Sequence, residues 1–196
     1  MKGFRKRRRG GIVGTFEGPE AALLANLVGQ VVELLRDRNG ESESSADPLA
    51  TMIGMAGPMT PPDDPVLARL LPDAYRDAPD DATEFRRFTE QTLSSAKVAN
   101  AEVVLAALAA GGLGADGPGE DASGDHVEVE LDEAQGWAWL KALTDVRLAF
   151  ATRIGIETEE DLEHMLASDD EAAIAMADIY DWLGYVQESL VHALDS

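Results

Sequence analysis

The residue types that most often carry catalysis or metal binding are sparse and widely separated in this chain. The three histidines are His126, His164 and His192, and none has a second histidine at the spacing of a helical zinc motif. The chain has no cysteine, which excludes disulfides, zinc–thiolate sites and thiol nucleophiles. We therefore expect no metal, no cofactor and no catalytic residue, and we predict that the protein is not an enzyme.

Two other patterns resemble catalytic motifs but lack the residues that the chemistry needs. Segment 10–15 contains three glycines but lacks the Gly-Lys-Ser/Thr ending of a phosphate-binding loop. Asp and Glu together number 37, so carboxylate pairs arise throughout the chain by chance. Only burial, which shifts pKa values, could turn such a pair into an acid–base site. We interpret these acids as solvated helix faces and helix caps.

The densest cluster of side chains that could bind something is a basic run at the start of the chain. Six basic residues occupy the first nine positions: Lys2, Arg5, Lys6, Arg7, Arg8 and Arg9. The other ten basic residues are set against 37 acidic ones, and the net charge is −21. Such an acidic body repels phosphate backbones, so we expect a protein partner rather than direct nucleic-acid binding. Our candidate partner-binding residues are Arg5, Arg7, Arg8 and Arg9.

The positions around this run predict a small antiparallel sheet. Residues 4–9 and 12–16 read as two extended stretches, and the Gly-Gly pair between them tolerates the positive φ of a tight hairpin turn. Segment 126–131 alternates apolar and acidic residues, which predicts a third strand with Val127, Val129 and Leu131 on one face. Glu128 and Glu130 on the other face could neutralise the hairpin arginines, which is the alternative to a binding surface.

The rest of the chain shows helical periodicity and helix-capping signals. Helices are predicted over about 19–39, 82–110, 133–154 and 171–194, with shorter ones after Asp47-Pro48, Asp64-Pro65 and Thr158. Asp81 is the expected N-cap of the second long helix, with a buried stripe that begins at Phe85 and Phe88. Asp132 is the expected N-cap of the third, with an apolar face that begins at Trp137.

These elements predict a mainly α protein, a helical bundle with a small antiparallel sheet of two to three strands. We expect a single domain over 1–196, with flexible segments at about 39–47 and 112–125. No apolar run reaches the ~20 residues that span a bilayer, and no apolar segment follows the basic start, so we expect a cytoplasmic protein with no membrane contact. An exposed apolar face around Trp182 and Tyr185 would favour a homodimer.

Four stretches of the sequence are distinctive: 64–75, 84–90, 145–156 and 180–188. In them the chain resembles, over nearly its whole length, a family of uncharacterised actinobacterial proteins classed as a domain of unknown function. The resemblance implies a genetic setting beside the ClpS protease adaptor, a JAMM-type metallopeptidase and a sulfur-carrier system for cysteine synthesis. Some members are described as redox-responsive transcriptional regulators that sense through cysteine pairs. Because this chain has no cysteine, the resemblance does not imply thiol sensing here.

The same stretches contain five arginines: Arg69, Arg86, Arg87, Arg147 and Arg153. We expect them to form structural ion pairs with helix carboxylates, and a cluster that binds a small anion is the alternative. Our first functional hypothesis is a non-enzymatic regulatory or adaptor protein that acts through protein–protein contacts, linked to proteolysis or cysteine biosynthesis. The alternative is a transcriptional regulator that acts with RNA polymerase or a sigma factor. A small enzyme ranks last.

Overall fold

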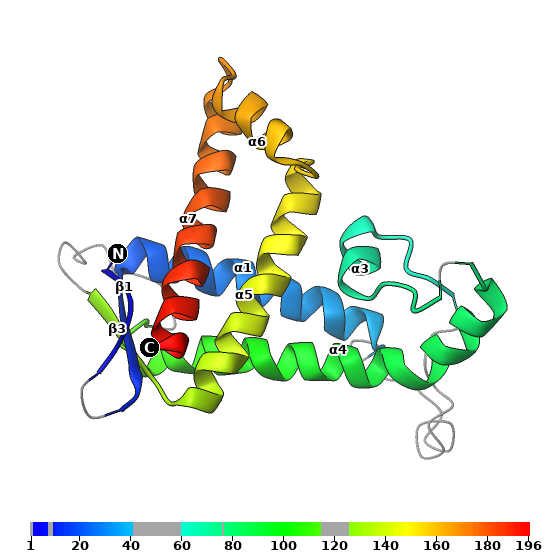
Figure 1. Ribbon diagram of the computed structural model, residues 1–196, viewed down its shortest axis with the longest axis horizontal. Coiled ribbons are helices and arrows are strands. Elements are labelled where there is room, and N and C mark those ends of the chain that lie inside the picture. Colours follow the sequence, from blue (N-terminus) through cyan, green and yellow to red (C-terminus); the bar gives the residue numbers. More distant parts are fainter. Residues whose placement is uncertain (1, 8–9, 41–59, 76, 115–125) are drawn as a thin grey trace.

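The computed structural model describes residues 2–7, 10–40, 60–75, 77–114 and 126–196, and two long helices form its base (Figure 1). Helix α1 (Gly18–Arg38) lies beside α4 (Pro79–Ala110), and both run along the long axis. Helices α5 (Glu133–Ile154) and α7 (Glu171–Asp195) stand across this base, and α6 (Glu159–Leu166) joins their far ends. The short α3 (Pro65–Leu70) packs beside α5. The predicted mainly α fold with a small sheet is thus confirmed.

The small sheet has three antiparallel strands in the order β1-β2-β3 and lies at one end of the molecule, near both termini (Figure 1). The strands are β1 (Lys2–Lys6), β2 (Ile12–Glu17) and β3 (His126–Leu131). The register pairs Val13 with Glu130 and Thr15 with Glu128. The predicted strands are therefore confirmed, but β1 ends at Lys6 rather than Arg9. The last pair of β1 and β2 is Lys6 with Ile12, so the connection between these strands is longer than the predicted two-residue turn. Within it, the Arg7 amide donates to the Gly11 carbonyl at 3.0 Å.

The inner face of the sheet packs on three aromatic rings. Phe4 lies edge-on to Phe16 and to Trp139, with ring centroids 5.8 and 5.4 Å apart, and Trp139 is fully buried. Trp137, which we expected on the apolar face of α5, is instead exposed. The apolar face of α5 is rotated relative to the prediction because Trp139, two residues further on, packs against Phe4 and Phe16 of the sheet. From the sheet, one hydrophobic cluster continues through α1, α3, α4, α5 and α7.

Local signals predict most helix ends in the described part of the chain. Asp64 caps α3 by accepting from the Val66 and Leu67 amides, and Pro65 takes the first helical position. Asp132 caps α5 in a capping box with Gln135, and Gly155 ends that helix at a φ of 78°. The predicted helix at Asp47-Pro48 and most of both predicted flexible segments lie outside the described residues.

The cap of α6 shows the same principle with an aspartate in place of the usual glutamate. The Thr158 hydroxyl accepts from the Asp161 amide, and the Asp161 carboxylate accepts from the Glu157 and Thr158 amides. The backbone hydrogen bond from Glu157, followed by the bonds from the hydroxyl and amide of Thr158, lowers the pKa of Asp161. This carboxylate is therefore stabilised in its charged form at the start of the helix that the sequence predicted after Thr158.

Helix α4 differs from its sequence prediction in both its start and its buried face. It begins at Pro79, with Ala78 as an N-cap that offers no side-chain bond, so Asp81 is not the cap. The predicted stripe is also wrong, because Phe85 and Phe88 are 45% and 59% exposed. The buried face instead comprises Ala82, Arg86, Glu90, Ser94, Val98, Ala101, Val104 and Leu108. Among the described helices, α4 is the one long and apolar enough to cross a membrane by length and composition, a test that core helices also pass.

Candidate functional site

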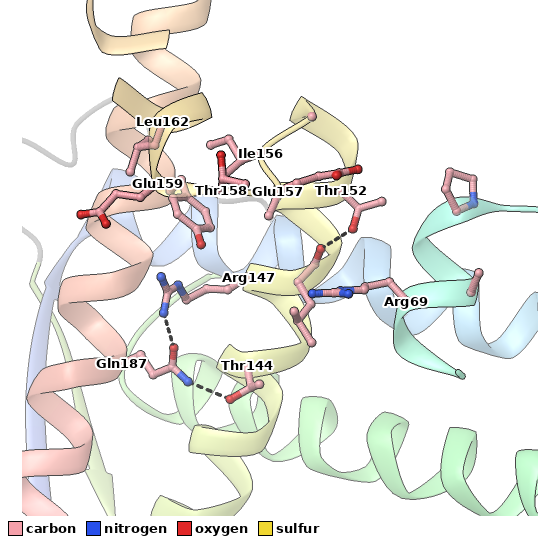
Figure 2. A pocket seen from close by; sticks show the side chains of 16 residues that line it. Arg69, Thr144, Arg147, Thr152, Ile156, Glu157, Thr158, Glu159, Leu162 and Gln187 are labelled. Atoms are coloured by element: carbon pink, nitrogen blue, oxygen red, sulfur yellow. Dashed lines mark hydrogen bonds between the residues drawn. The ribbon is translucent and has the colours of Figure 1, made fainter. Parts of the chain in front are cut away.

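A cleft of about 1020 Å³ opens along one face of α5, bounded by α3, α6 and α7 (Figure 2). Its walls combine an aliphatic surface with polar side chains, which make up nine of the sixteen lining residues. The aliphatic side chains come from α3, α5, the connection from α5 to α6, and α6: Pro65, Ala68, Leu148, Ala151, Ile156 and Leu162. The polar groups include Arg69, Thr144, Arg147, Tyr180 and Gln187. Placed polar groups orient ligands in such pockets, and this cleft offers them beside an aliphatic surface.

Arg147 is the most constrained polar group of this cleft. It extends from α5 toward α7, where its guanidinium carbon lies 4.9 Å from the centre of the Tyr180 ring. Its Nη1 donates to Gln187 Oε1 at 2.8 Å, and Gln187 Nε2 donates in turn to Thr144 Oγ1 at 2.7 Å (Figure 2). The chain of bonds fixes the amide of Gln187 with its oxygen toward the arginine. Arg147 is thereby oriented, yet its Nε is buried without an acceptor.

Arg69 contributes a second positive charge from the opposite side of the cleft. Figure 2 shows it extending from α3 toward α5. It is exposed, and no described carboxylate lies within 4.0 Å of it. The rim near the start of α6 carries two exposed acids, Glu157 and Glu159. The cleft therefore has positive charge along its length and negative charge at one edge.

The other arginines from the distinctive stretches do not join this cleft. Arg153 donates to Asp64 at 3.1 Å, which ties the end of α5 to the cap of α3. The guanidinium of Arg87 lies 5.7 Å from the Phe88 ring centre on the exposed side of α4. Arg86 is buried. Of the five arginines considered together from the sequence, the structure thus brings only Arg69 and Arg147 to one place.

Arg86 forms a buried ion-pair network that links three segments. Its guanidinium contacts Glu90 one turn later on α4, donates to Asp73 at 2.7 Å, and donates to the Leu71 carbonyl at 3.2 Å. Glu90 also accepts from Arg38 Nε of α1 at 2.7 Å. Burial opposes the charge of Arg86, but its bonds to Asp73 and Glu90 outweigh that effect, so its pKa is raised. The network is a structural one, as the ion-pair interpretation expected for this residue.

A second buried pair joins α4 to α5. Lys97 Nζ donates to Asp145 Oδ1 at 2.5 Å, and Asp145 is 6% exposed. Burial raises the pKa of Asp145, and the nearby Lys97 ammonium only partly opposes that shift. Such a shifted carboxyl would attract attention as an acid–base group, but it lies in a packed interface away from the lining of the cleft. We assign it to the fold.

The basic strand is partly neutralised, in the way that the strand alternation suggested. Arg7 donates to Glu130 at 2.6 Å and to Glu128 at 3.1 Å, across the sheet from β3. These pairs are exposed and are worth little energy singly. Arg5 has no carboxylate partner among the described residues, while Arg8 and Arg9 lie outside them. Arg7 is therefore paired with acids of β3, whereas Arg5 is exposed to solvent.

The described part of the chain contains no group of three or more His, Asp or Glu residues that could hold a metal ion. His126 starts β3, His164 lies on α6, and His192 lies near the end of α7. Sequence reasoning named Arg69 and Arg147 but missed Tyr180 and Gln187 as their neighbours. Tyr180, Gly184 and Gln187 are four and then three residues apart, so they lie along one side of α7. They form a site only because this side of α7 packs against α5.

The fold and the cleft define a mainly helical protein with a small edge sheet and an arginine-containing pocket, without a described catalytic constellation. The chain belongs to the family described as Domain of unknown function (DUF2017), which it matches over residues 1–194. No solved structure matches it.

The curated relatives are mycobacterial proteins with a regulatory name. The chain is 34% identical over 177 residues to the "Putative oxidative stress regulator AosR" of Mycobacterium leprae, covering 89% of this chain and 78% of that protein. It is 34% identical over 181 residues to the "Oxidative stress regulator AosR" of Mycobacterium tuberculosis strain H37Rv, with the same coverage. The relative from Mycobacterium bovis has the same name and the same identity.

Proposed function

We propose that this protein is a non-enzymatic regulator that acts by contacting another protein. The observation that carries the proposal is its similarity, over 89% of its length, to proteins named as oxidative stress regulators. The acidic composition adds support, because a net charge of −21 disfavours direct binding to nucleic acid and favours a partner with a basic surface.

One exposed surface suits such a contact. Tyr75, Phe85 and Phe88 form an aromatic surface at the end of α4 remote from the sheet, and they are 49%, 45% and 59% exposed. The rings of Tyr75 and Phe85 pack edge-on with centroids 5.8 Å apart, so the two residues form one continuous surface. Exposed aromatic clusters of this kind are enriched at protein interfaces, since they supply large contact area at low entropic cost.

Two experiments in the host test the proposal. The first compares transcript levels in strains with and without the chain, before and after peroxide exposure. The second purifies tagged chain from the host and quantifies co-purifying proteins for three forms: unchanged, Phe85→Ser with Phe88→Ser, and Arg5→Ser with Arg7→Ser. A stoichiometric partner that one double variant loses would support a contact-based regulator and would locate its surface. Unchanged transcripts and unchanged protein levels in the deleted strain would refute a regulatory role.

The two finer forms of the proposal differ in what changes first. An adaptor that serves proteolysis or cysteine biosynthesis alters the half-lives of specific proteins while their transcripts stay constant. A regulator that acts with RNA polymerase or a sigma factor alters transcripts directly and co-purifies with the polymerase. Pulse-chase protein half-lives measured beside transcript levels separate the two. We favour the second form slightly less, because no described helix presents a basic recognition surface.

A further inference from the structure

The arginine of the cleft lacks the counter-ion that its setting demands. In the described part of the chain, Arg7, Arg36, Arg38, Arg86 and Arg153 each lie within 4.0 Å of a carboxylate. Arg147 has none, although the chain holds 37 acidic residues. A guanidinium keeps its proton, and its charge is costly to enclose without an opposite charge. Arg5, Arg69 and Arg87 also lack a described carboxylate partner, but among these four arginines only Arg147 has a buried Nε without an acceptor.

The surroundings of Arg147 hold it ready for an anion. The Tyr180 ring covers one side at 4.9 Å, and Gly184 lies close by on α7, where a Cβ would make ordinary van der Waals contact with Nη2 at 3.4 Å. Gln187 accepts from Nη1 alone, and no described group accepts from Nη2 or Nε. Four of the five N–H donors of the guanidinium thus remain without a described protein acceptor; the Nε–H is buried, and the other three belong to Nη1 and Nη2.

The rest of the cleft specifies what kind of anion fits. Its aliphatic wall, with Leu148, Ile156 and Leu162, favours a ligand with a hydrocarbon body. The rim acids Glu157 and Glu159 and the overall charge of −21 disfavour a dianion such as phosphate. A planar carboxylate matches the guanidinium and carries a single charge. We propose that this cleft binds a small aliphatic carboxylate through Arg147, with Arg69 adding long-range attraction.

This proposal goes beyond the regulatory function and is tested on the isolated full-length protein. Isothermal titration calorimetry is performed with isocaproate, leucine, isocaproamide and inorganic phosphate. We expect saturable binding of isocaproate or leucine, and binding of the uncharged amide weaker by about tenfold or more, because it loses a charge-assisted hydrogen bond. Tighter binding of leucine than of isocaproate would show that the rim acids receive an ammonium group, and the reverse order would identify a simple carboxylate.

Two substitutions at the site sharpen the test. Arg147→Met removes the charge and should weaken carboxylate binding about tenfold or more. Gln187→Glu is nearly isosteric and places a carboxylate beside Nη1 of Arg147, where Gln187 Oε1 now lies at 2.8 Å. It should supply the missing counter-ion internally, so it should abolish carboxylate binding. It also removes the hydrogen bond that Gln187 Nε2 donates to Thr144 Oγ1, so the melting temperature should change little. Arg87→Met is the matched control, because Arg87 lies on the outward side of α4 and does not line the cleft. It should change neither carboxylate affinity nor the melting temperature.

Several outcomes would overturn the proposal. One is that neither carboxylate saturates the protein up to about 10 mM, a concentration above the range of ordinary specific dissociation constants. Others are that isocaproamide binds as tightly as isocaproate, or that phosphate alone binds. The last is that the Gln187→Glu protein binds carboxylate as tightly as the unchanged protein. If Arg147→Met fails to fold, the Gln187→Glu comparison and the amide comparison on unchanged protein still decide the question.

Discussion

Replacing Glu90 with leucine is expected to lower the free energy of unfolding by about 3 kcal/mol, because it leaves Arg86 charged in the core without its nearest carboxylate. The side chains of Arg86 and Glu90 are 5% and 2% exposed. Glu90 also neutralises Arg38, whose Nε lies 2.7 Å from it. Leucine has similar volume and helix propensity, so the change isolates the electrostatic loss from packing and helix propensity.

The remaining partners of Arg86 set the magnitude. Removing one member of a buried pair costs about 3–5 kcal/mol. Arg86 would keep the Asp73 carboxylate at 2.7 Å and the Leu71 carbonyl at 3.2 Å, which places the cost at the lower end. With a urea m-value of about 2 kcal/mol/M, a loss of about 3 kcal/mol lowers the unfolding midpoint by about 1.5 M. That shift is large against the total stability of an ordinary domain.

Urea unfolding followed by circular dichroism measures this shift, and the chain offers a matched control. Glu102 pairs with Arg36 at 2.5 Å between two exposed side chains, so Glu102→Leu should cost less than about 1 kcal/mol. Adding Arg86→Met to Glu90→Leu should recover much of the loss, since an apolar pair no longer encloses a charge. A Glu90→Leu midpoint shift no larger than that of Glu102→Leu would refute the reasoning.

Three further substitutions test the packing and the electrostatics. Burial raises the pKa of Asp145 above its ordinary value of 3.8, and Lys97 only partly opposes this shift. Because the folded state holds the proton more tightly than the unfolded state, Asp145 contributes its whole stabilisation below pH 3.8. This stabilisation is lost as pH rises through the folded-state pKa. The stability of the unchanged protein relative to Asp145→Asn should thus fall as pH rises from about 4, and a constant difference would contradict the assignment. Gly14→Ala would place a Cβ 2.7 Å from the Phe4 ring and should cost about 1–3 kcal/mol in thermal unfolding. Gly29→Ala meets no atom within 4 Å inside α1 and should gain about 0.5–1 kcal/mol; equal shifts in the two glycine variants would rule out the steric explanation.

The parts of this fold that follow local rules could be predicted from the sequence. The alternation in segment 126–131 predicted β3, and its acids meet Arg7 across the sheet. The Asp64-Pro65 pair, Asp132 with Gln135, and Thr158 begin helices where expected, since a cap depends on residues within one turn.

Helix α4 could not be predicted in the same way, because its burial depends on distant partners. Phe85 and Phe88 have the hydrophobicity of core residues but face solvent, whereas Arg86 and Glu90 are buried. These charges can be buried because Arg38 of α1 and the segment after α3 supply partners for them. A helical periodicity within α4 cannot predict the approach of either partner. The same holds for the cleft, since Arg147 meets Tyr180 and Gln187 only where α7 packs on α5.

The distribution of unpaired arginines in so acidic a chain has a separate explanation at each position. In the described part of the chain, Arg5, Arg69, Arg87 and Arg147 lack a carboxylate within 4.0 Å. Arg5 lies on the edge strand β1, where an exposed charge discourages pairing with another sheet. Arg87 covers the exposed ring of Phe88. Neither arginine of the cleft lies at a sheet edge. Arg147 also lies over an aromatic ring, that of Tyr180, but unlike Arg87 it has a buried Nε without an acceptor. Arg69 is exposed, so water can solvate its charge. Arg147 is partly enclosed, so the proposed anion would account for its missing counter-ion, and an internal carboxylate at position 187 is the change that would make that anion unnecessary.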